Sequence, residues 1–401
     1  MFAKLLIAGA ILAALVALDP GGGFAGIGAL IGLLKECASG RTEWCNGDFP
    51  FIPPKLAVDM ALDRLMPTAE QVMDKYLGKG NTLVMKDKVV IVTGGSSGLG
   101  YQAALHLLQR GATVVIACRN VKKGENALQE MIDNGATGKG YVMELELSDL
   151  DSVKSFATNF LAMKLPLHVL LNNAAVMMPG YGVQLYSKQG HEQQFAVNHL
   201  AHFYLTSLLE DKLLSSGSKS EPARAVYITT SGIEFWRGPD DDGHLSRQIP
   251  AFQHDNYHSF FGYINSKALN VMTAREQQKR WKAKGGSAIS FSVNPGLIGG
   301  FFSGMSADIP TMLDQAGAMK GAFYSWPFAH AAKSPQQGGA TLVYAAIAPE
   351  VVDQVNNGVF YYNNNKITTA GALSGHPEYF TNDSTNLECW ERTEAILKGK
   401  T

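Results

Sequence analysis

The chain has 401 residues, of which 46% are hydrophobic and 17% charged, and its formal net charge is −1. This composition is typical of a globular protein and excludes a mainly disordered chain. A near-neutral charge without a basic stripe excludes a nucleic-acid-binding protein. The four cysteines have neither the spacing of a disulfide framework nor that of a zinc site, so no metal site is predicted.

The N-terminal part of the chain is apolar. One uninterrupted apolar run covers residues 5–18, and a second run at 24–34 follows a Pro-Gly cluster. The first run is shorter than the roughly 20 residues that cross a bilayer as a helix. A membrane anchor or signal segment is predicted over residues 1–46: an anchor is the favoured interpretation, and a cleaved secretory signal and a buried structural extension are the alternatives. We therefore expect a membrane-associated protein, at the endoplasmic reticulum or another organelle membrane.

A helical collar or linker is predicted over residues 47–86. Apolar residues recur there with helical spacing at 55–65 and at 69–76. Such helices could lie on a membrane surface as an amphipathic collar. Packing on the following domain is the favoured interpretation.

Apolar strands alternate with helices from residue 87 onward. Strands are predicted at 89–92, 113–117, 141–145, 167–171, 226–230 and 288–293, with 358–361 as a candidate last strand. The predicted helices cover 99–110, 121–133, 149–163, 191–214 and 260–283. This alternation implies right-handed βαβ units and a parallel sheet. The predicted fold is α/β: a Rossmann-type doubly wound parallel sheet, forming a single catalytic domain over 87–401 with an apolar N-terminal extension.

A glycine-rich turn follows the first strand directly and opens the first helix. It reads Thr-Gly-Gly-Ser-Ser-Gly-Leu-Gly over residues 93–100. In this context the backbone can approach a pyrophosphate at the N-terminus of a helix, where amides and the helix dipole favour an anion. The residues predicted to contact a dinucleotide here are Thr93, Gly94, Ser96, Ser97, Gly98, Leu99 and Gly100.

The second strand ends in a basic residue where an NAD-specific site usually has Asp or Glu. Arg119 stands there, followed by Asn120, and Lys122 and Lys123 lie just beyond. A guanidinium suits a 2′-phosphate, which it binds through charge-assisted and often bidentate hydrogen bonds. We therefore predict NADP(H) as the cofactor, with Arg119 and Asn120 among its contacts.

Tyr263 and Lys267 form a Tyr-x-x-x-Lys pair in the predicted helix 260–283. Positions i and i+4 share one face of a helix, so the phenol and the ammonium point into one cleft. A nearby positive charge favours a phenolate, so Lys267 is expected to lower the pKa of Tyr263. Tyr263 could then donate a proton to a carbonyl oxygen or accept one from an alcohol.

The glycine turn together with the Tyr-Lys pair resembles the short-chain dehydrogenase/reductase family over residues 86–397. The resemblance is closest to membrane-associated retinol-dehydrogenase-like members, and it implies a bound nicotinamide dinucleotide. It also implies a catalytic hydroxyl at the end of the fifth strand, which is Ser231, with Thr230 as the alternative. Asn198 lies in a segment similar to the family's NHLGHF, which implies that it kinks a helix and supports a proton relay to Lys267.

The resemblance implies further positions beside the cofactor. These are Glu146, Leu147, Asn173, Ala174, Pro295, Gly296 and Ile298, and the cofactor is also expected to contact Tyr263 and Lys267. The sequence departs from the family pattern at Glu146, at Ala175 and at Gly300, where Asp, Gly and Thr are usual. These departures motivate an alternative, a non-catalytic scaffold subunit of a membrane complex. A second alternative is a protochlorophyllide-reductase-like enzyme, which shares the Tyr-Lys pair and an Asn-Ala-Ala-Val stretch.

The segment 301–330 takes the place of the family's substrate lid and is rich in aromatic residues and Met. Such a lining suits an apolar ligand. The predicted function is hydride transfer between NADP(H) and a carbonyl or alcohol of an apolar substrate of the retinoid, steroid or fatty aldehyde class. The other predicted partners are the membrane, through the N-terminus, and either a second copy of the chain or a membrane-complex subunit.

Overall fold

The computed structural model describes residues 68–77, 85–177, 184–230, 232–233, 259–296, 298, 333–355, 360–362, 366–368 and 378–399. The chain divides into two compact units. The larger unit contains residues 67–295 and 335–401, and the smaller contains 1–66 and 296–334. The predicted anchor, the first collar helix and the predicted lid lie outside the described residues.

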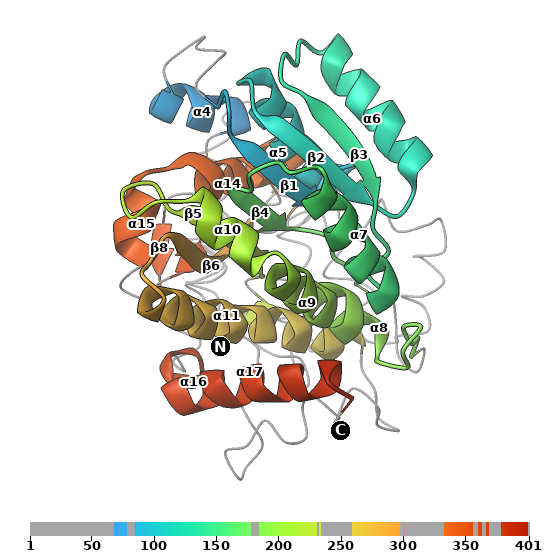
Figure 1. The fold of residues 1–401 in the computed structure, drawn as a ribbon, viewed down its shortest axis with the longest axis vertical. Helices are drawn as coiled ribbons and strands as arrows, with labels where there is room; N and C mark the ends of the chain where they lie inside the picture. The colour runs from blue at the N-terminus through green and yellow to red at the C-terminus, as the bar shows by residue number, and fades with distance from the viewer. Residues whose placement is uncertain are drawn as a thin grey trace, which may run out of the picture. The chain divides into compact units, whose positions relative to one another are not determined.

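The larger unit is built on an eight-stranded sheet (Figure 1). Its strands are β1 (Val89–Thr93), β2 (Thr113–Cys118), β3 (Gly140–Glu144), β4 (Val169–Asn172), β5 (Ala223–Ile228), β6 (Ala288–Asn294), β7 (Phe360–Tyr362) and β8 (Lys366–Thr368). Their order in space is β3-β2-β1-β4-β5-β6-β7-β8. Strands β1 to β7 pair in parallel, whereas β7 and β8 are antiparallel. The order reverses between β1 and β4, as in a doubly wound sheet, so the predicted Rossmann-type α/β fold is confirmed.

Helices cover both faces of this sheet. They are α4 (Ala69–Leu77), α5 (Gly98–Gln109), α6 (Val121–Asp133), α7 (Leu150–Ala162), α8 (Gln193–Phe195), the π-helix η3 (Ala196–Leu200), α9 (Ala201–Leu208), α10 (Glu210–Ser216), α11 (Ser259–Ala283), α14 (Pro335–Ile347), α15 (Glu350–Val355), α16 (Glu378–Thr381) and α17 (Asp383–Leu397). One core lies between the sheet and α4, α5, α6, α14 and α15. A second core lies between the opposite face and α7, α9, α10 and α11.

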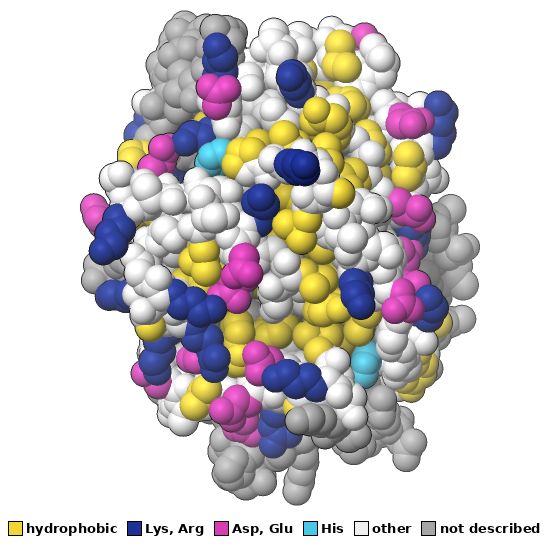
Figure 2. All heavy atoms as spheres, in the orientation of Figure 1, with side chains coloured by type: hydrophobic (Ala, Val, Ile, Leu, Met, Phe, Trp, Pro, Cys, Tyr) yellow, Lys and Arg dark blue, Asp and Glu magenta, His cyan; other side chains and the backbone are white. Residues whose placement is uncertain are grey.

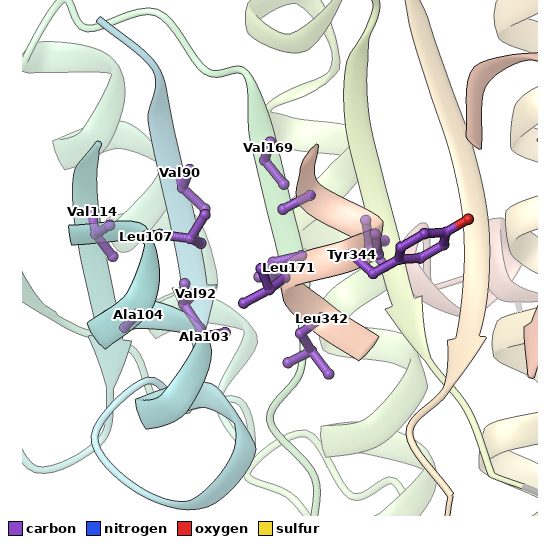
Figure 3. Packing of buried hydrophobic residues seen from close by; sticks show 14 of the residues in the cluster. Val90, Val92, Ala103, Ala104, Leu107, Val114, Val169, Leu171, Leu342 and Tyr344 are labelled. Atoms are coloured by element: carbon purple, nitrogen blue, oxygen red, sulfur yellow. The ribbon is translucent and has the colours of Figure 1, made fainter. Parts of the chain in front are cut away.

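The two cores follow from the alternation of side chains along each strand. All five residues of β1 are buried. Val90 and Val92 pack toward α5, where Figure 3 shows them beside Ala103 and Leu107. Val89 and Ile91 belong to the core on the other face. Because β1 lies in a parallel sheet that is covered on both faces, both sets of its alternating side chains are apolar or β-branched.

The second collar helix is present as α4. Val72 of this helix joins the core beneath α5 and α14. Asp74 forms an ion pair with Arg110 at the end of α5, with 2.7 Å between Oδ1 and Nη2. Helix α4 therefore packs on the domain, whereas the collar as a whole stays a prediction.

The predicted helix 191–214 is not one continuous helix. It consists of α8, η3, α9 and α10, because η3 widens one turn and the chain leaves helical geometry at Leu209, where φ is −103° and ψ is 5°. Helix α14 was not predicted. Its residues 338–346 are all buried, so it has no polar face to produce an amphipathic pattern. A Cβ on Gly339 would lie 2.6 Å from Gln102 Cβ, so this glycine lets α14 approach α5 closely.

Charges of both signs are mixed on the surface of the described residues. Figure 2 shows basic and acidic side chains interspersed with hydrophobic ones on one face. Several of these charges form ion pairs, among them Lys284 with Glu210 at 2.7 Å and Lys279 with Asp383 at 3.0 Å. Within the described part of the chain, no helix is both long and apolar enough to span a bilayer.

Candidate active site

The glycine turn between β1 and α5 is held tightly against the loop that follows β4. Gly94 has φ +67° and Gly98 has φ +59°, a region that favours glycine. A Cβ on Gly100 would lie 2.5 Å from the carbonyl oxygen of Gly94 and 2.6 Å from Asn173 Nδ2. The turn therefore requires glycine for its conformation at Gly94 and Gly98 and for its close packing at Gly100.

The exposed side of this turn fits the pyrophosphate of a dinucleotide. Ser97 is the N-cap of α5 but makes no side-chain capping bond. A Cβ on Gly98 would meet no atom within 4 Å, so the backbone is accessible there. The first amides of a helix have no partner within the helix, and together with the helix dipole they attract an anion. The predicted cofactor contacts in the turn are thus brought together around a suitable site.

Thr93 binds the glycine turn to the loop after β4. This loop contains Asn173 and Ala174, which were predicted to contact the cofactor, so both predicted segments lie side by side. Thr93 Oγ1 accepts hydrogen bonds from the amides of Asn173 at 2.9 Å and Ala174 at 3.0 Å. Asn173 Nδ2 donates in return to the Thr93 carbonyl at 2.8 Å. The carboxyl ends of β1 and β4 are therefore fixed to each other at the point where the strand order reverses.

Arg119 and Glu146 meet beyond the carboxyl ends of β2 and β3. Arg119 Nε lies 3.7 Å from Glu146 Oε2, and the Arg119 side chain is 81% exposed. The other oxygen, Glu146 Oε1, accepts from the amide of Ser148 at 2.9 Å and from its hydroxyl at 2.7 Å. Glu146 thus shapes its own loop with one oxygen and faces Arg119 with the other.

Two neighbouring predicted residues have evident structural roles. Asn120 caps α6, because its Oδ1 accepts from the Lys123 amide at 2.9 Å. Leu147 is buried in the core beside α7. Both shape loops at the cofactor edge, and their contacts with a cofactor stay a prediction.

Tyr263 and Lys267 lie on one face of α11, as their spacing predicts. Lys267 Nζ is 5.8 Å from the centroid of the Tyr263 ring. It donates to the carbonyl of Ile228, the last residue of β5, at 2.9 Å. Lys267 is 1% exposed, whereas Tyr263 is only partly buried. The pair therefore lies at the carboxyl edge of the sheet, next to the end of β5.

The expected lowering of the Tyr263 pKa is wrong for this structure. Burial raises the pKa of the Tyr263 phenol instead. Burial also lowers the pKa of Lys267 to about 7, so this side chain is only partly charged near neutral pH. Desolvation of both groups outweighs their mutual interaction. The phenol is consequently held in its protonated form, which can donate a proton.

Asn198 joins the loop after β4 to the helix that carries the Tyr-Lys pair. It lies within η3, and π-turns of this kind often mark functional sites. Its Oδ1 accepts from the Val176 amide at 2.8 Å, and its Nδ2 donates to the Val176 carbonyl at 2.8 Å and to Ser266 Oγ at 3.0 Å. Ser266 Oγ in turn donates to the Tyr263 carbonyl at 2.7 Å. The side chain of Asn198 thus positions the catalytic helix.

The main-chain carbonyl of Asn198 is also bound by two side chains. Asn270 Nδ2 lies 3.0 Å from this oxygen and His202 Nδ1 lies 3.2 Å from it. Two donors occupy both lone pairs of a carbonyl. Neither Ser266 nor Asn270 was among the predicted site residues. Their spacing could have indicated them. Asn270 lies four residues after Ser266 and three after Lys267, so it shares a face of α11 with each of them.

The catalytic hydroxyl stays a prediction. Ser231 lies outside the described residues. Thr230, the alternative, accepts from the Gly232 amide through Oγ1 at 3.1 Å. The preceding Thr229 donates to the Lys267 carbonyl at 3.0 Å, so the end of β5 is fixed to α11.

The last predicted cofactor contacts follow β6. Pro295 is buried directly after the strand. Gly296 has φ +85°, as a turn at this point requires. Ile298 belongs to the smaller unit, where it forms a parallel bridge with Lys333. The contacts of these three residues with a cofactor stay a prediction.

His199 is bound as a structural residue. Its Nδ1 lies 3.1 Å from Asn270 Oδ1 and its Nε2 lies 3.1 Å from Thr393 Oγ1 of α17. Burial lowers its pKa to about 4. Among the described residues, no group of three His, Cys, Asp or Glu side chains is arranged to hold a metal ion.

Comparisons with known proteins agree with this geometry. The family model for short chain dehydrogenase matches residues 88–231, which include the glycine turn. WW domain-containing oxidoreductase of Gallus gallus is 31% identical over 356 residues, which cover 87% of this chain and 78% of that protein. Retinol dehydrogenase 11 of Homo sapiens is 33% identical over 293 residues, covering 72% of this chain and 82% of that protein.

Solved structures share the fold. A crystal structure of an uncharacterized protein from Mycobacterium paratuberculosis has a TM-score of 0.56 at 24% identity, covering 83% of this chain and 98% of that one. The NADP active-site complex of RhlG from Pseudomonas aeruginosa has a TM-score of 0.50 at 20% identity, covering 67% and 93%. A nicotinamide dinucleotide is the cofactor typical of the matching family. The chain belongs to the short-chain dehydrogenase family and is an oxidoreductase that acts on CH–OH or C=O groups.

Proposed function

We propose that the protein transfers a hydride between NADP(H) and the carbonyl or alcohol group of an apolar substrate. The observation that carries this proposal is a continuous set of hydrogen bonds. It runs from Thr93 through the loop after β4 to Asn198, and from Asn198 through Ser266 to Tyr263. A cofactor at the glycine turn and a substrate oxygen at Tyr263 would therefore share one edge of the sheet, where ligands of such sheets bind.

Tyr263, Lys267 and Asn198 would have different roles in this reaction. When bound, the nicotinamide supplies or accepts the hydride. Tyr263 donates its phenolic proton to the substrate oxygen during reduction, because its raised pKa keeps the proton on the phenol. Lys267 holds its place through the Ile228 carbonyl, and Asn198 keeps the helix in register. A positioned acid of this kind contributes roughly 10²- to 10⁴-fold in rate.

The preference for NADP(H) over NAD(H) rests on Arg119. Its guanidinium is largely exposed beside the end of β2, and its partner Glu146 holds it only at 3.7 Å. A 2′-phosphate would offer stronger, charge-assisted hydrogen bonds than this distant carboxylate. The complex of RhlG with NADP is consistent with this preference on the same fold.

The proposed substrates are retinoids, with steroids and fatty aldehydes as the wider class. Retinol dehydrogenase 11 of Homo sapiens is 33% identical over 293 residues, and retinol dehydrogenase 12 of Bos taurus is 38% identical over 213 residues. The aromatic and Met residues at 301–330 suit the same apolar ligands. The non-catalytic scaffold alternative is set aside, because the chain is an oxidoreductase of this family.

The test is NADPH oxidation by the full chain against retinal, a steroid ketone and a long-chain aldehyde. Tyr263→Phe should lower turnover by about 10²-fold or more while NADPH still binds. Arg119→Ala should weaken NADPH binding about tenfold and leave NADH binding unchanged. Lys122→Ala, which removes a nearby exposed charge, is the matched control. Equal turnover by Tyr263→Phe and the natural protein would contradict the proposal, and light-dependent turnover of protochlorophyllide alone would favour the second alternative.

The protein is further proposed to be held at an organelle membrane, such as that of the endoplasmic reticulum, by the apolar run at 5–18. The support is the sequence itself, since this run and the second one at 24–34 contain no charged residue.

Alkaline carbonate extraction of cells that express the full chain tests this proposal. The protein should stay with the membranes, and a variant that lacks residues 1–46 should be released. Release of both forms would contradict membrane anchoring. Mass spectrometry of the N-terminus separates an anchor, which keeps Met1 or the following residue, from a cleaved signal.

A further inference from the structure

His202 lies between the two halves of the site. It is fully buried on α9. Its Nε2 is 2.9 Å from Thr93 Oγ1, at the start of the glycine turn, and its Nδ1 is 3.2 Å from the carbonyl oxygen of Asn198. One imidazole therefore touches both the turn that fits the cofactor and the residue that positions the Tyr-Lys helix.

The partners of His202 fix where its proton lies. The carbonyl of Asn198 can only accept, so Nδ1 must carry the proton. Burial lowers the pKa of His202 to about 3, so the ring is neutral at physiological pH and Nε2 has no proton. Nε2 is then an acceptor, and the hydroxyl of Thr93 donates to it.

This assignment completes the hydrogen bonds of Thr93. Its single proton goes to His202 Nε2, and its lone pairs accept from the amides of Asn173 and Ala174. The carbonyl of Leu171, at 3.2 Å, is the more distant alternative for that proton. With Nε2 as its acceptor, the hydroxyl is held in the orientation that receives both loop amides.

The contacts form a closed ring. Thr93 binds the loop after β4 at Asn173 and Ala174, and Asn198 binds the same loop at Val176. His202 then connects Asn198 back to Thr93. The loop, the turn and η3 cannot move independently while this ring is intact.

We propose that His202 is a positioning residue that couples the cofactor turn to the Tyr263–Lys267 helix. It acts on the turn through Thr93 and on the helix through Asn198, whose side chain binds Ser266. This inference rests on the proposed function, because it assigns His202 to the same cofactor and the same proton donor. His199 differs, since its two nitrogens face Asn270 and Thr393 rather than the glycine turn.

Two substitutions separate the two contacts of the imidazole. An Asn side chain places an amide near the position of Nδ1, so His202→Asn keeps a donor for the Asn198 carbonyl and removes the acceptor for Thr93. A Gln side chain reaches the position of Nε2, so His202→Gln keeps the acceptor for Thr93 and removes the donor for Asn198. Each variant therefore preserves one of the two hydrogen bonds of His202 and removes the other.

The readouts are NADPH affinity, measured by fluorescence titration of the full chain, and retinal turnover at saturating NADPH. His202→Asn should weaken NADPH binding about threefold to tenfold and change kcat less than twofold, the scale expected for one hydrogen bond. His202→Gln should lower kcat about threefold to tenfold and keep NADPH affinity within twofold. Thr93→Val should weaken NADPH binding, and the Thr93→Val/His202→Asn double variant should bind no worse than Thr93→Val alone.

The control is a histidine at the opposite end of β1. His168 Nδ1 accepts from the Val89 amide at 3.0 Å, far from the glycine turn. In His168→Asn the side-chain oxygen can accept from the same amide, so the variant makes the same kind of change outside the site. It should leave NADPH affinity and kcat unchanged. Thermal midpoints of all variants report stability separately, and a purely structural role would shift the midpoints of both His202 variants without splitting affinity from kcat.

NADPH affinity decides the test even if retinal is a poor substrate. Additive losses in the double variant, or equal NADPH affinities for His202→Asn and His202→Gln, would overturn the inference while leaving the proposed function intact. Failure of the natural protein to bind NADPH would instead overturn the proposed function.

Discussion

The cofactor half and the catalytic half of the site are built in different ways. The glycine turn is a contiguous segment whose shape depends on backbone conformation, with positive φ at Gly94 and Gly98. The catalytic half depends on side chains that are far apart in sequence, since Asn198 binds Ser266 across 68 residues and Val176 across 22. A local backbone motif can fail without unfolding its surroundings. A buried network that joins several elements should lose stability and activity together.

Asn198→Ala should have the largest effect, because it breaks the catalytic half at its centre. It removes the partners of the Val176 amide and carbonyl, which are partly buried, and of the buried Ser266 hydroxyl. We expect a loss of about 2–4 kcal/mol in the free energy of unfolding. Turnover should fall about 100-fold or more, because Tyr263 is no longer held in place. Urea unfolding and steady-state kinetics check both values.

A matched control is Asn134→Ala at the exposed end of α6. Asn134 Nδ2 donates to the Glu130 carbonyl at 2.8 Å, which is a local contact near solvent. Its loss should cost less than about 0.5 kcal/mol, as is usual at the surface. Similar costs for the two Asn substitutions would contradict the claim that the network around Asn198 stabilises the fold.

Gly100→Ala should act on the cofactor half with the next largest effect. The added Cβ would lie 2.5 Å from the Gly94 carbonyl, so the turn or the start of α5 must shift. Overpacking of this kind costs roughly 1–3 kcal/mol, which corresponds to about 5- to 150-fold in NADPH affinity if the shift is confined to the binding turn. Thermal unfolding without NADPH should change much less than for Asn198→Ala. An unchanged NADPH affinity would show that the turn tolerates the methyl group.

Lys267 gives the catalytic half a dependence on pH. Burial lowers its pKa from 10.5 to about 7, so the folded protein releases this proton before the unfolded chain does. Between these two values the unfolded state binds more protons, so this group makes stability rise with pH. The rise between pH 7 and pH 9 should be about 2–3 kcal/mol.

Lys267→Met should abolish this contribution, because Met fills similar volume without a charge. The natural protein should therefore gain stability relative to Lys267→Met as the pH increases from 7 to 9, because only the natural protein loses the penalty of a buried charge. Urea unfolding at both pH values measures it. The same pH dependence in both proteins would contradict a lowered pKa at Lys267.

The two halves also differ in how far the sequence predicts them. Strands β1 to β6 lie within a few residues of their predicted positions, because buried apolar runs and the glycine turn are local signals. The contact between His202 and Thr93 spans 109 residues, and no local pattern indicates which donor meets which acceptor across such a distance. The direction of the Tyr263 pKa was predicted wrongly for the same reason. The spacing to Lys267 is visible in the sequence, whereas the burial that outweighs it depends on packing.

Glu146→Gln should have the smallest effect, and it tests the cofactor half of the site at Arg119. The carboxylate lies 3.7 Å from Arg119 Nε, and the Arg119 side chain is 81% exposed, so the pair is worth less than about 1 kcal/mol. Glutamine can still accept from Ser148, which keeps the loop after β3 in shape, but it no longer attracts Arg119 or repels a phosphate. NADPH affinity should therefore rise about twofold to fivefold at low salt, and the gain should shrink at high ionic strength, because screening weakens exposed charge pairs. Fluorescence titrations with NADPH and NADH at two salt concentrations measure this. An equal gain for NADH would mean that Glu146 acts on a part of the cofactor other than the 2′-phosphate, and so would separate its role from that of Arg119.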